Sequence, residues 1–287
     1  MEAEHDSPPG DIYPRAAWRL IVDPPLDGPA NMAIDEAIAE HVRAEAVKPT
    51  LRLYAWEPPC LSLGYSQSAA DVDFERLNAR GWGVVRRLSG GRAILHVDEL
   101  TYSVVVPADD PRVAGGVVES YRRLSRGLLA ALASLGAQVR AEQASSKARE
   151  SSKGPVCFEV PSDYEITVNG RKLIGSAQTR RGEGGAVLQH GALPLYGDVG
   201  RICDVLVFDE EAVREQARLS VRLRAITLEE ALVQRVHFER VAAAIVEGFA
   251  QALNVELHSE LLSAEEQQRA AALRAEKYAA DIWTLRR

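Results

Sequence analysis

The sequence predicts an α+β fold, in which helices flank a mixed and largely antiparallel β-sheet. Many short runs of β-branched and aromatic residues are separated by tight-turn signals, as between the strands of an antiparallel sheet. Fewer and longer segments repeat apolar residues at helical spacing. The two kinds of segment alternate without the regular strand–helix–strand rhythm of a parallel sheet, so we expect helices packed on a mixed sheet.

The N-terminal half supplies most of the expected strands. Residues 1–14 are rich in Pro, Asp and Glu, which predicts a disordered tail before a single domain over residues 15–287. Asn31 is expected to cap a helix that runs to about Ala44. We expect strands at 18–22, 50–56, 60–64, 83–87 and 100–106, and a short helix at 71–79.

The chain beyond residue 106 contains two long helical patterns. One runs from Glu119 to Leu135 and ends at Gly136, and the other covers most of residues 227–253. Between them, residues 140–153 are polar and show no apolar period. They predict a loop, and both a plain connector and a lid over a site are open interpretations.

The strongest hairpin signal is Asn169-Gly170, which stands between two strand-like runs. A two-residue turn there pairs Val168 with Arg171 and Thr167 with Lys172. Because cross-strand partners share a face, Lys172 is expected on one face with Thr167, Glu165 and Ile174.

Composition narrows the class of function. The chain has 287 residues, of which 46% are hydrophobic, and a net charge of −7, so broad binding to nucleic acid or to a membrane surface is not expected. Cys60, Cys157 and Cys203 are too few and too scattered for a disulfide framework, which favours a reducing compartment. The N-terminal residues do not resemble a secretion signal, and no window is apolar enough to span a membrane. We therefore expect a cytoplasmic protein that acts as a monomer.

Cys157 and Lys172 are the candidate catalytic pair. A thiol attacks an acyl carbonyl as its thiolate, and a nearby ammonium group favours that form. Lys172 follows Cys157 by 15 residues, a separation that a hairpin can close. The alternatives are a buried, unreactive cysteine and a solvated strand lysine.

A glycine loop follows the strand at 83–87. Gly90 and Gly91 allow backbone N–H groups to approach a ligand closely, and Arg86, Arg87 and Arg92 could hold a carboxylate or phosphate. The pattern is not a nucleotide-binding motif, and a plain turn between exposed arginines explains it equally well.

His96 and His190 each lie beside a strand, where a structural role is more common than a catalytic one. No His, Cys or Asp cluster has metal-ligand spacing, so no metal is expected. The sequence also has no nucleophile elbow of the serine hydrolase type.

Taken together, three blocks of the sequence resemble the lipoate/octanoate transfer family, which is related to the biotin-protein ligases. They are RRLSGGRAILH with ELTYS (86–96 and 99–103), VNGRKLIGSAQ (168–178) and QHG (189–191), and the C-terminal EKY and IW also match. The resemblance implies a biotin/lipoate-protein ligase-like catalytic domain. It implies Cys157 and Lys172 as catalytic residues. It also implies a substrate site made of Arg86, Arg87, Ser89, Gly90, Gly91, Arg92, His96, Gly175, Ser176, Ala177 and His190.

Within that family the chain is most similar to the octanoyltransferases, because it has Gly90-Gly91-Arg92, a cysteine at 157 and a short C-terminus. The resemblance implies that octanoyl-acyl carrier protein is the donor and that a lipoyl domain, with glycine-cleavage H protein favoured, is the acceptor. The thioester donor is already activated, so no cofactor is expected. Amidotransfer between lipoyl domains and ATP-dependent ligation are the alternatives within the family.

Overall fold

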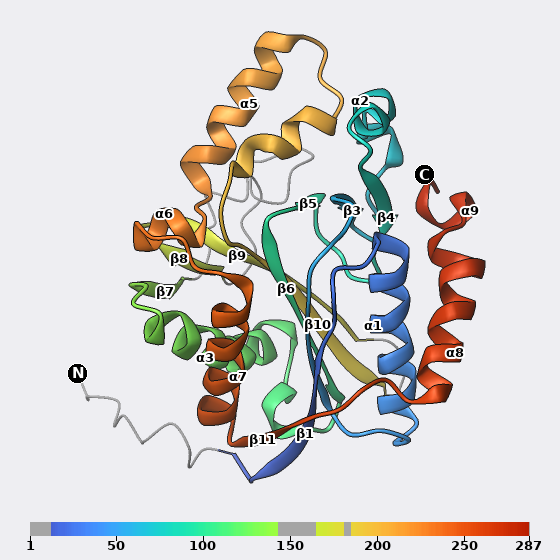
Figure 1. Cartoon of the computed structure of the whole chain (residues 1–287), viewed down its shortest axis with the longest axis vertical. Helices are drawn as coiled ribbons and strands as arrows, with labels where there is room; N and C mark the ends of the chain where they lie inside the picture. Colours follow the sequence, from blue (N-terminus) through green and yellow to red (C-terminus); the bar gives the residue numbers. More distant parts are fainter. Residues whose placement is uncertain (1–12, 143–164, 181–184, 287) are drawn as a thin grey trace.

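The computed structural model describes residues 13–142, 165–180 and 185–286 (Figure 1). An eight-stranded sheet crosses the molecule in the order β11-β1-β2-β6-β10-β9-β8-β7. Within the described part of this eight-stranded sheet, only the pairs β1–β11 and β1–β2 are parallel, so the predicted mixed, largely antiparallel α+β fold is confirmed. The strands are β1 Ala16–Val22, β2 Thr50–Tyr54, β6 Glu99–Pro107, β7 Val139–Glu142, β8 Glu165–Val168, β9 Arg171–Arg180, β10 Ala186–Pro194 and β11 Val255–Ser259.

A second sheet of three strands lies in the upper half of Figure 1. Its order is β4 (Gly83–Arg86), β3 (Cys60–Leu63) and β5 (Ile94–His96). Its apolar side chains pack with α2 (Phe74–Ala79), the turn Val199–Val205 and α5 (Glu211–Arg224) into a separate core. The glycine loop joins β4 to β5, so this small sheet carries the loop.

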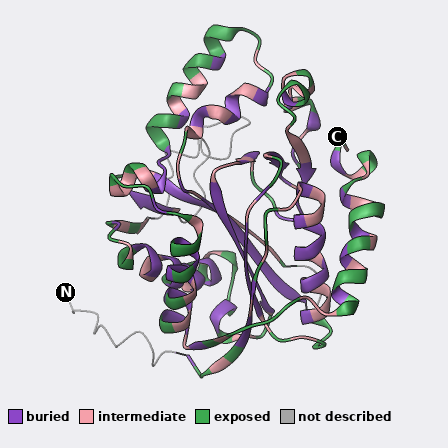
Figure 2. Ribbon diagram, in the orientation of Figure 1, coloured by how far each residue is buried: buried purple, intermediate pink, exposed green. Residues whose placement is uncertain are grey.

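Helices cover both faces of the large sheet, whose strands are buried between them (Figure 2). Strand β6 has buried side chains on both faces. Tyr102 and Val104 belong to the core under α3 and α7, whereas Val105 belongs to the core under α1. Alternate residues of a strand point to opposite faces, so β6 serves both cores. The helices are α1 Gly28–Arg43, α3 Val117–Ser134, α6 Leu228–Leu232, α7 Phe238–Leu253, α8 Ala264–Leu273 and α9 Asp281–Thr284. None of the helices within the described residues is long and apolar enough to cross a membrane.

Helix α1 begins earlier than Asn31, the predicted cap. Asp27 is the N-cap and accepts a hydrogen bond from the backbone of Ala30, with Pro29 in the first turn. Asn31 is fully buried inside the helix, where its amide donates to the carbonyls of Leu26 and Ala55. The Asp-Gly-Pro sequence before Asn31 is the stronger start signal, since proline suits the first helical turn.

The Asn169-Gly170 hairpin has the predicted register, with Val168 opposite Arg171 and Thr167 opposite Lys172. Both turn residues have positive φ, at 51° and 72°, as a type I′ turn requires. The prediction that Ile174 shares the face of Lys172 is wrong. A bulge places Ile174 opposite Ile166, and both belong to the core under α3 and α7.

Two predicted boundaries also change. Tyr13 was expected in the disordered tail, but it is buried in the main core, and its carbonyl accepts a hydrogen bond from Asn254. Residues 1–12 lie outside the described part. The loop predicted at 140–153 begins later than expected, because residues 140–142 pair with β8 as part of β7 and only the rest lies outside the described residues.

The C-terminal segment packs along the outer side of α1 (Figure 1). Arg19 and Glu266 form a bidentate pair that is almost completely buried, and Lys277 pairs with Glu36 on α1. Helix α8 then passes through a π-type turn, Arg274–Tyr278, into α9.

Candidate active site

The glycine loop is held from inside by Arg87. Its guanidinium donates to the carbonyls of Gly90 and Arg92, both at 2.8 Å, and to the carbonyl of Ser62 at 2.9 Å. Gly91 has a φ of +96° and is exposed, as is Gly90. The loop therefore keeps one shape while the backbone of its two glycines stays accessible.

Arg86 does not reach the site. It is fully buried, and its guanidinium donates to backbone carbonyls of Gly64, Gln67, Thr284 and Arg286. This network ties β4 to the C-terminal segment, so the structure gives Arg86 a structural role in place of the expected anion-binding one. Arg92 on the loop is half-buried, and within the described residues its side chain forms no ion pair.

His190 joins the glycine loop to a buried carboxylate. Its Nε2 lies 2.6 Å from Ser89 Oγ, and its Nδ1 lies 3.5 Å from Asp35 Oδ2. Burial lowers the pKa of His190, although Asp35 opposes this effect. A carboxylate can only accept a hydrogen bond, so the neutral ring carries its proton on Nδ1, facing Asp35, and its Nε2 accepts a hydrogen bond from the Ser89 hydroxyl.

Asp35 on α1 is fully buried and receives three other hydrogen bonds, each at 2.9 Å. The donors are Arg52 and Ser103 to one oxygen and Tyr54 to the other. Burial alone would raise the pKa of Asp35, but its bond with His190 and the charge of Arg52 outweigh burial and lower it. Asp35 is therefore an ionised carboxylate that fixes the orientation of His190.

His96 belongs to a second network of the same kind. Its Nδ1 lies 2.8 Å from Glu99 Oε1, and its Nε2 lies 2.7 Å from Ser62 Oγ. The ring stacks on Trp56 with centroids 3.9 Å apart, and Trp56 Nε1 donates to Thr101 at 2.8 Å. These contacts hold one wall of a pocket in place.

The two networks border a narrow apolar pocket. Gly175 and Ala177 of β9 line it, together with His96 and His190. Ser176 does not, because alternate residues point to opposite faces and its hydroxyl bonds to Tyr102 on the other side of the sheet at 2.8 Å. The remaining lining residues are Met32, Tyr54, Trp56, Ser62, Arg87, Ile94, Thr101, Gly191 and Ala192.

Lys172 lies on the same strand as Gly175 and Ala177. Its side chain is only 4% exposed, and its Nζ lies 2.8 Å from Glu165 Oε1. The register of β9 and β10 places Ala177 opposite His190. One strand therefore carries both the buried ammonium group and part of the pocket wall.

Cys157, the predicted nucleophile, lies outside the described residues. The other two cysteines, Cys60 and Cys203, are both fully buried. Burial raises the pKa of the Cys60 thiol, which keeps it protonated and unreactive. Neither of these two thiols is placed for acyl chemistry.

Sequence reasoning missed Asp35, Ser62 and Trp56. For Asp35 a signal was available, because Asn31 and Asp35 are four residues apart on the apolar face of α1, where polar residues must have buried partners. Ser62 and Trp56 had no comparable signal, since both fit ordinary strand positions. Within the described part of the chain, no group of three or more His, Cys, Asp or Glu residues could hold a metal ion.

Comparison with known proteins agrees with this geometry. The sequence profile of the lipoyl protein ligase A/B catalytic domain matches residues 27–250. Two curated relatives, both named octanoyltransferase LipM, are 45% identical to this chain. The protein from Kyrpidia tusciae aligns over 94% of this chain and 99% of its own, and the one from Moorella thermoacetica over 96% and 100%. The bipartite lipoate protein ligase from Thermoplasma acidophilum superposes with a TM-score of 0.78 at 24% identity, covering 95% of this chain and 98% of its own, and shares its fold.

Proposed function

The chain belongs to the lipoyl protein ligase A/B catalytic domain family, and we propose that it is an octanoyltransferase of protein lipoylation that works through a thioester on Cys157. In the first step the Cys157 thiolate attacks the carbonyl of the donor thioester, and the donor thiolate leaves. In the second step the amine of a lipoyl-domain lysine attacks the acyl-cysteine, an amide forms, and the Cys157 thiolate is released. No ATP is consumed, because the thioester supplies the activation.

The apolar pocket on the strand of Lys172 is the observation that carries this proposal. At a rise of about 3.3 Å per residue, Gly175 lies about 10 Å and Ala177 about 17 Å along β9 from Lys172. An octanoyl chain is about 9 Å long, with C–C bonds of about 1.5 Å. A chain whose tail lies in the pocket would therefore place its carbonyl near the Lys172 ammonium group.

Lys172 has two tasks in this scheme. Its positive charge lowers the pKa of the Cys157 thiol, and its N–H groups orient the acyl carbonyl. Cys157 precedes Glu165, the ion-pair partner of Lys172, by eight residues, which span at most about 29 Å when extended. The chain can thus bring the thiol to Lys172.

The glycine loop and His190 have supporting tasks. The exposed backbone of Gly90 and Gly91 can donate to the oxyanion of the tetrahedral intermediate. The proton of the incoming amine goes to neutral His190, whose unprotonated imidazole can accept it near pH 7, or to a water that passes it on to bulk solvent.

We also propose the partners and setting. An acyl donor and a lipoyl-domain acceptor follow from the relatives, and we assign octanoyl-acyl carrier protein and glycine-cleavage H protein to these places. Residues 15–287 would act as one monomeric domain in the cytoplasm, where a catalytic thiol stays reduced.

The decisive experiment is an intact-mass measurement after incubation with octanoyl-acyl carrier protein in the absence of ATP. We expect one octanoyl adduct on the wild type and none on Cys157→Ala. Cys203→Ala, which makes the same substitution at a buried cysteine with no role in the proposed reaction, is the matched control and should keep the adduct. No adduct on the wild type would refute the thioester route. Acylation that requires octanoate and ATP would indicate a ligase, and acylation only from a lipoylated protein would indicate an amidotransferase.

The role of Lys172 has its own test, the pH profile of Cys157 alkylation. A fall of the thiol pKa from about 8.5 to about 7 raises the thiolate fraction at neutral pH about sixteenfold. Lys172→Ala should abolish that gain, whereas Arg171→Ala, which removes the neighbouring charge paired with Glu230, should keep it. An unchanged profile for Lys172→Ala would remove Lys172 from this role.

A further inference from the structure

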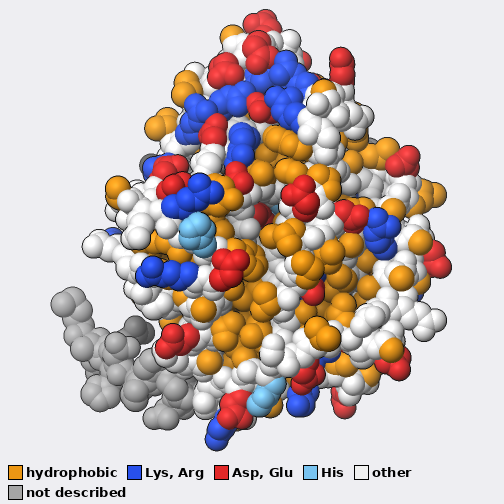
Figure 3. Space-filling model, viewed as in Figure 1, with side chains coloured by type: hydrophobic (Ala, Val, Ile, Leu, Met, Phe, Trp, Pro, Cys, Tyr) orange, Lys and Arg blue, Asp and Glu red, His pale blue; other side chains and the backbone are white. Residues whose placement is uncertain are grey.

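Lys172 carries its positive charge inside the protein. On the face of the molecule shown in Figure 3, Lys and Arg side chains gather at the top, over α5, where they meet solvent. The Lys172 side chain is only 4% exposed, and its Nζ lies 2.8 Å from Glu165 Oε1. Because solvent is largely excluded there, the groups next to Lys172 decide what a substrate meets beside the ammonium group.

A bulge in β9 places Lys172 on the same face of the sheet as the pocket. Gly175 and Ala177 line the pocket, and Lys172 lies three residues before Gly175. Strict alternation over three residues would turn Lys172 to the opposite face. Instead, Leu173 and Ile174 both belong to the core under α3 and α7, at the irregularity in the pairing of β8 with β9. This extra residue on the core side returns Lys172 to the pocket face.

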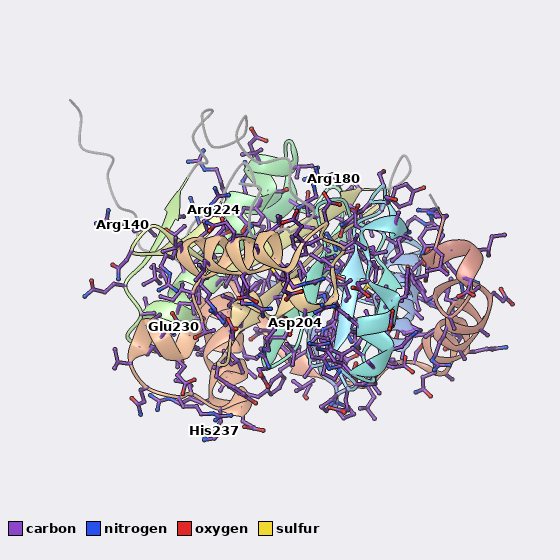
Figure 4. All side chains as sticks on the ribbon, turned by 90° about the horizontal axis from the view of Figure 1, so that it is seen from above. Arg140, Arg180, Asp204, Arg224, Glu230 and His237 are labelled. Atoms are coloured by element: carbon purple, nitrogen blue, oxygen red, sulfur yellow. The ribbon has the colours of Figure 1, made fainter. Side chains whose placement is uncertain are left out.

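Thr167 of β8 lies on this face directly beside Lys172. The register pairs the two residues, and cross-strand partners have Cβ atoms about 5 Å apart. Ile166 and Val168 belong to the core under α3 and α7, so Thr167 between them points to the other face. On its other side Thr167 pairs with Arg140 of β7, which Figure 4 labels near the outer edge of the molecule.

The Thr167 hydroxyl is buried, and it has no hydrogen-bond partner among the residues that the structure describes. The residue is only 5% exposed. Leaving a buried hydroxyl unpaired is unfavourable, and valine would have the same shape without this penalty. The other buried threonines of the described residues all have partners: Thr50, Thr101, Thr227 and Thr284. The Thr167 hydroxyl is therefore available to a group that a substrate brings to Lys172.

We propose that Thr167 is a further catalytic residue, whose hydroxyl donates a hydrogen bond to the acyl carbonyl oxygen beside Lys172. The inference rests on the proposed octanoyl transfer, which places the carbonyl of the donor thioester at Lys172. A carbonyl oxygen accepts hydrogen bonds and has no proton to donate, so it matches both the ammonium group and the unpaired hydroxyl.

The hydrogen bond from Thr167 would strengthen during the reaction. When the Cys157 thiolate attacks, a carbon–sulfur bond forms and the C=O π electrons move onto the oxygen. When the tetrahedral intermediate collapses, the C=O bond forms again and the donor thiolate leaves. Thr167 keeps its proton throughout, and its bond is strongest while the oxygen carries negative charge.

The test is single-turnover acylation by octanoyl-acyl carrier protein, followed by intact mass over a range of donor concentrations. Thr167→Val removes the hydroxyl and keeps the shape of the side chain, whereas Thr167→Ser keeps the hydroxyl. The matched control is Thr179→Val, because Thr179 is a half-buried residue of β9 that does not line the pocket.

We expect Thr167→Val to lower the saturating acylation rate at least about tenfold, with little change in the donor concentration for half-maximal rate, because the hydrogen bond matters most in the transition state. Thr167→Ser should keep most of the wild-type rate. The Tm of Thr167→Val should equal or exceed that of the wild type, since an unpaired buried hydroxyl is removed. Thr179→Val should acylate as the wild type does.

Three outcomes would overturn the proposal. They are an unchanged rate for Thr167→Val, a loss of rate that Thr167→Ser shares, and a fall in the Tm of Thr167→Val, which would give the hydroxyl a structural role. A higher pH midpoint for Cys157 alkylation in Thr167→Val would also overturn it, because the hydroxyl would then contact the thiolate. A wild type that is not acylated would instead refute the proposed function itself, so the two failures are distinguishable.

Discussion

Replacement of Asp35 by Asn is expected to destabilise the protein by about 4 kcal/mol. The carboxylate accepts hydrogen bonds at 2.9 Å from Arg52, Tyr54 and Ser103, and it faces His190 Nδ1. An amide keeps one acceptor oxygen, but its NH2 group would face the donors Tyr54 and His190. Two hydrogen bonds to a charged group, each worth about 1.5–3 kcal/mol, are lost, in line with about 3–5 kcal/mol for breaking a buried ion pair.

The assay is urea unfolding at pH 7 and a thermal melt. For a domain of this size a loss of 4 kcal/mol corresponds to a fall of about 7 °C in Tm. Asp209→Asn is the matched control, because Asp209 is exposed and within the described residues has no ion-pair partner. A loss below about 1 kcal/mol for Asp35→Asn would refute the account of Asp35 as the charge that holds this network together.

The sign of the pH dependence follows from the lowered pKa of Asp35. A carboxyl group whose folded pKa lies below its unfolded value of about 3.9 stabilises the protein above that pH and loses this contribution as the pH falls through the folded pKa. The wild type should therefore lose more stability than Asp35→Asn between pH 5 and pH 3. Parallel acid profiles for the two proteins would contradict the assignment.

Two other predictions use the same measurements. Gly191→Ala should lower the free energy of unfolding by about 1–3 kcal/mol, because a Cβ there would lie 2.5 Å from Ser176 Oγ and 2.6 Å from Tyr102 Cε1. An unchanged Tm would contradict this expectation and would show that β9 shifts to relieve the clash at little cost. Burial lowers the pKa of His190 in the folded protein, so the unfolded chain takes up the proton first as the pH falls below about 6.5, and the wild type loses stability. His190→Gln should therefore lose less stability than the wild type between pH 7.5 and pH 5.5. Equal slopes for wild type and variant over this range would exclude His190 as the titrating group.

Local chemistry explains what could be predicted from the sequence. The Asn169-Gly170 turn fixes its own register, so the pairing of Thr167 with Lys172 was accessible without the fold. The bulge before Ile174 was not, because it depends on how two strands fit the core. Asn31 was misplaced because the stronger Asp27 cap lies just upstream.

The arginines of the glycine loop show the other limit. Arg86 and Arg87 are adjacent in the sequence and chemically identical. Arg86 donates to a carbonyl of the C-terminal segment, almost 200 residues away, whereas Arg87 donates to carbonyls of the glycine loop itself. No local pattern distinguishes them, because the acceptors that decide their roles are brought together only by the tertiary fold. The motifs of the candidate site could therefore be identified from the sequence, but the separate roles of Arg86 and Arg87 could not.

The order of strands in the large sheet has a consequence for the way the chain folds. Strand β1 is flanked by β2 and by β11, and its pairing of Ala16 with Val255 spans 239 residues. Until β11 has been synthesised and docked, the Ala16–Val22 edge displays unpaired backbone groups, which is the geometry that recruits other chains. Contacts this distant in sequence also form slowly. During synthesis, then, the interval between the emergence of β1 and that of β11 is the period of greatest aggregation risk, and chaperones that bind nascent chains have most to protect at this edge.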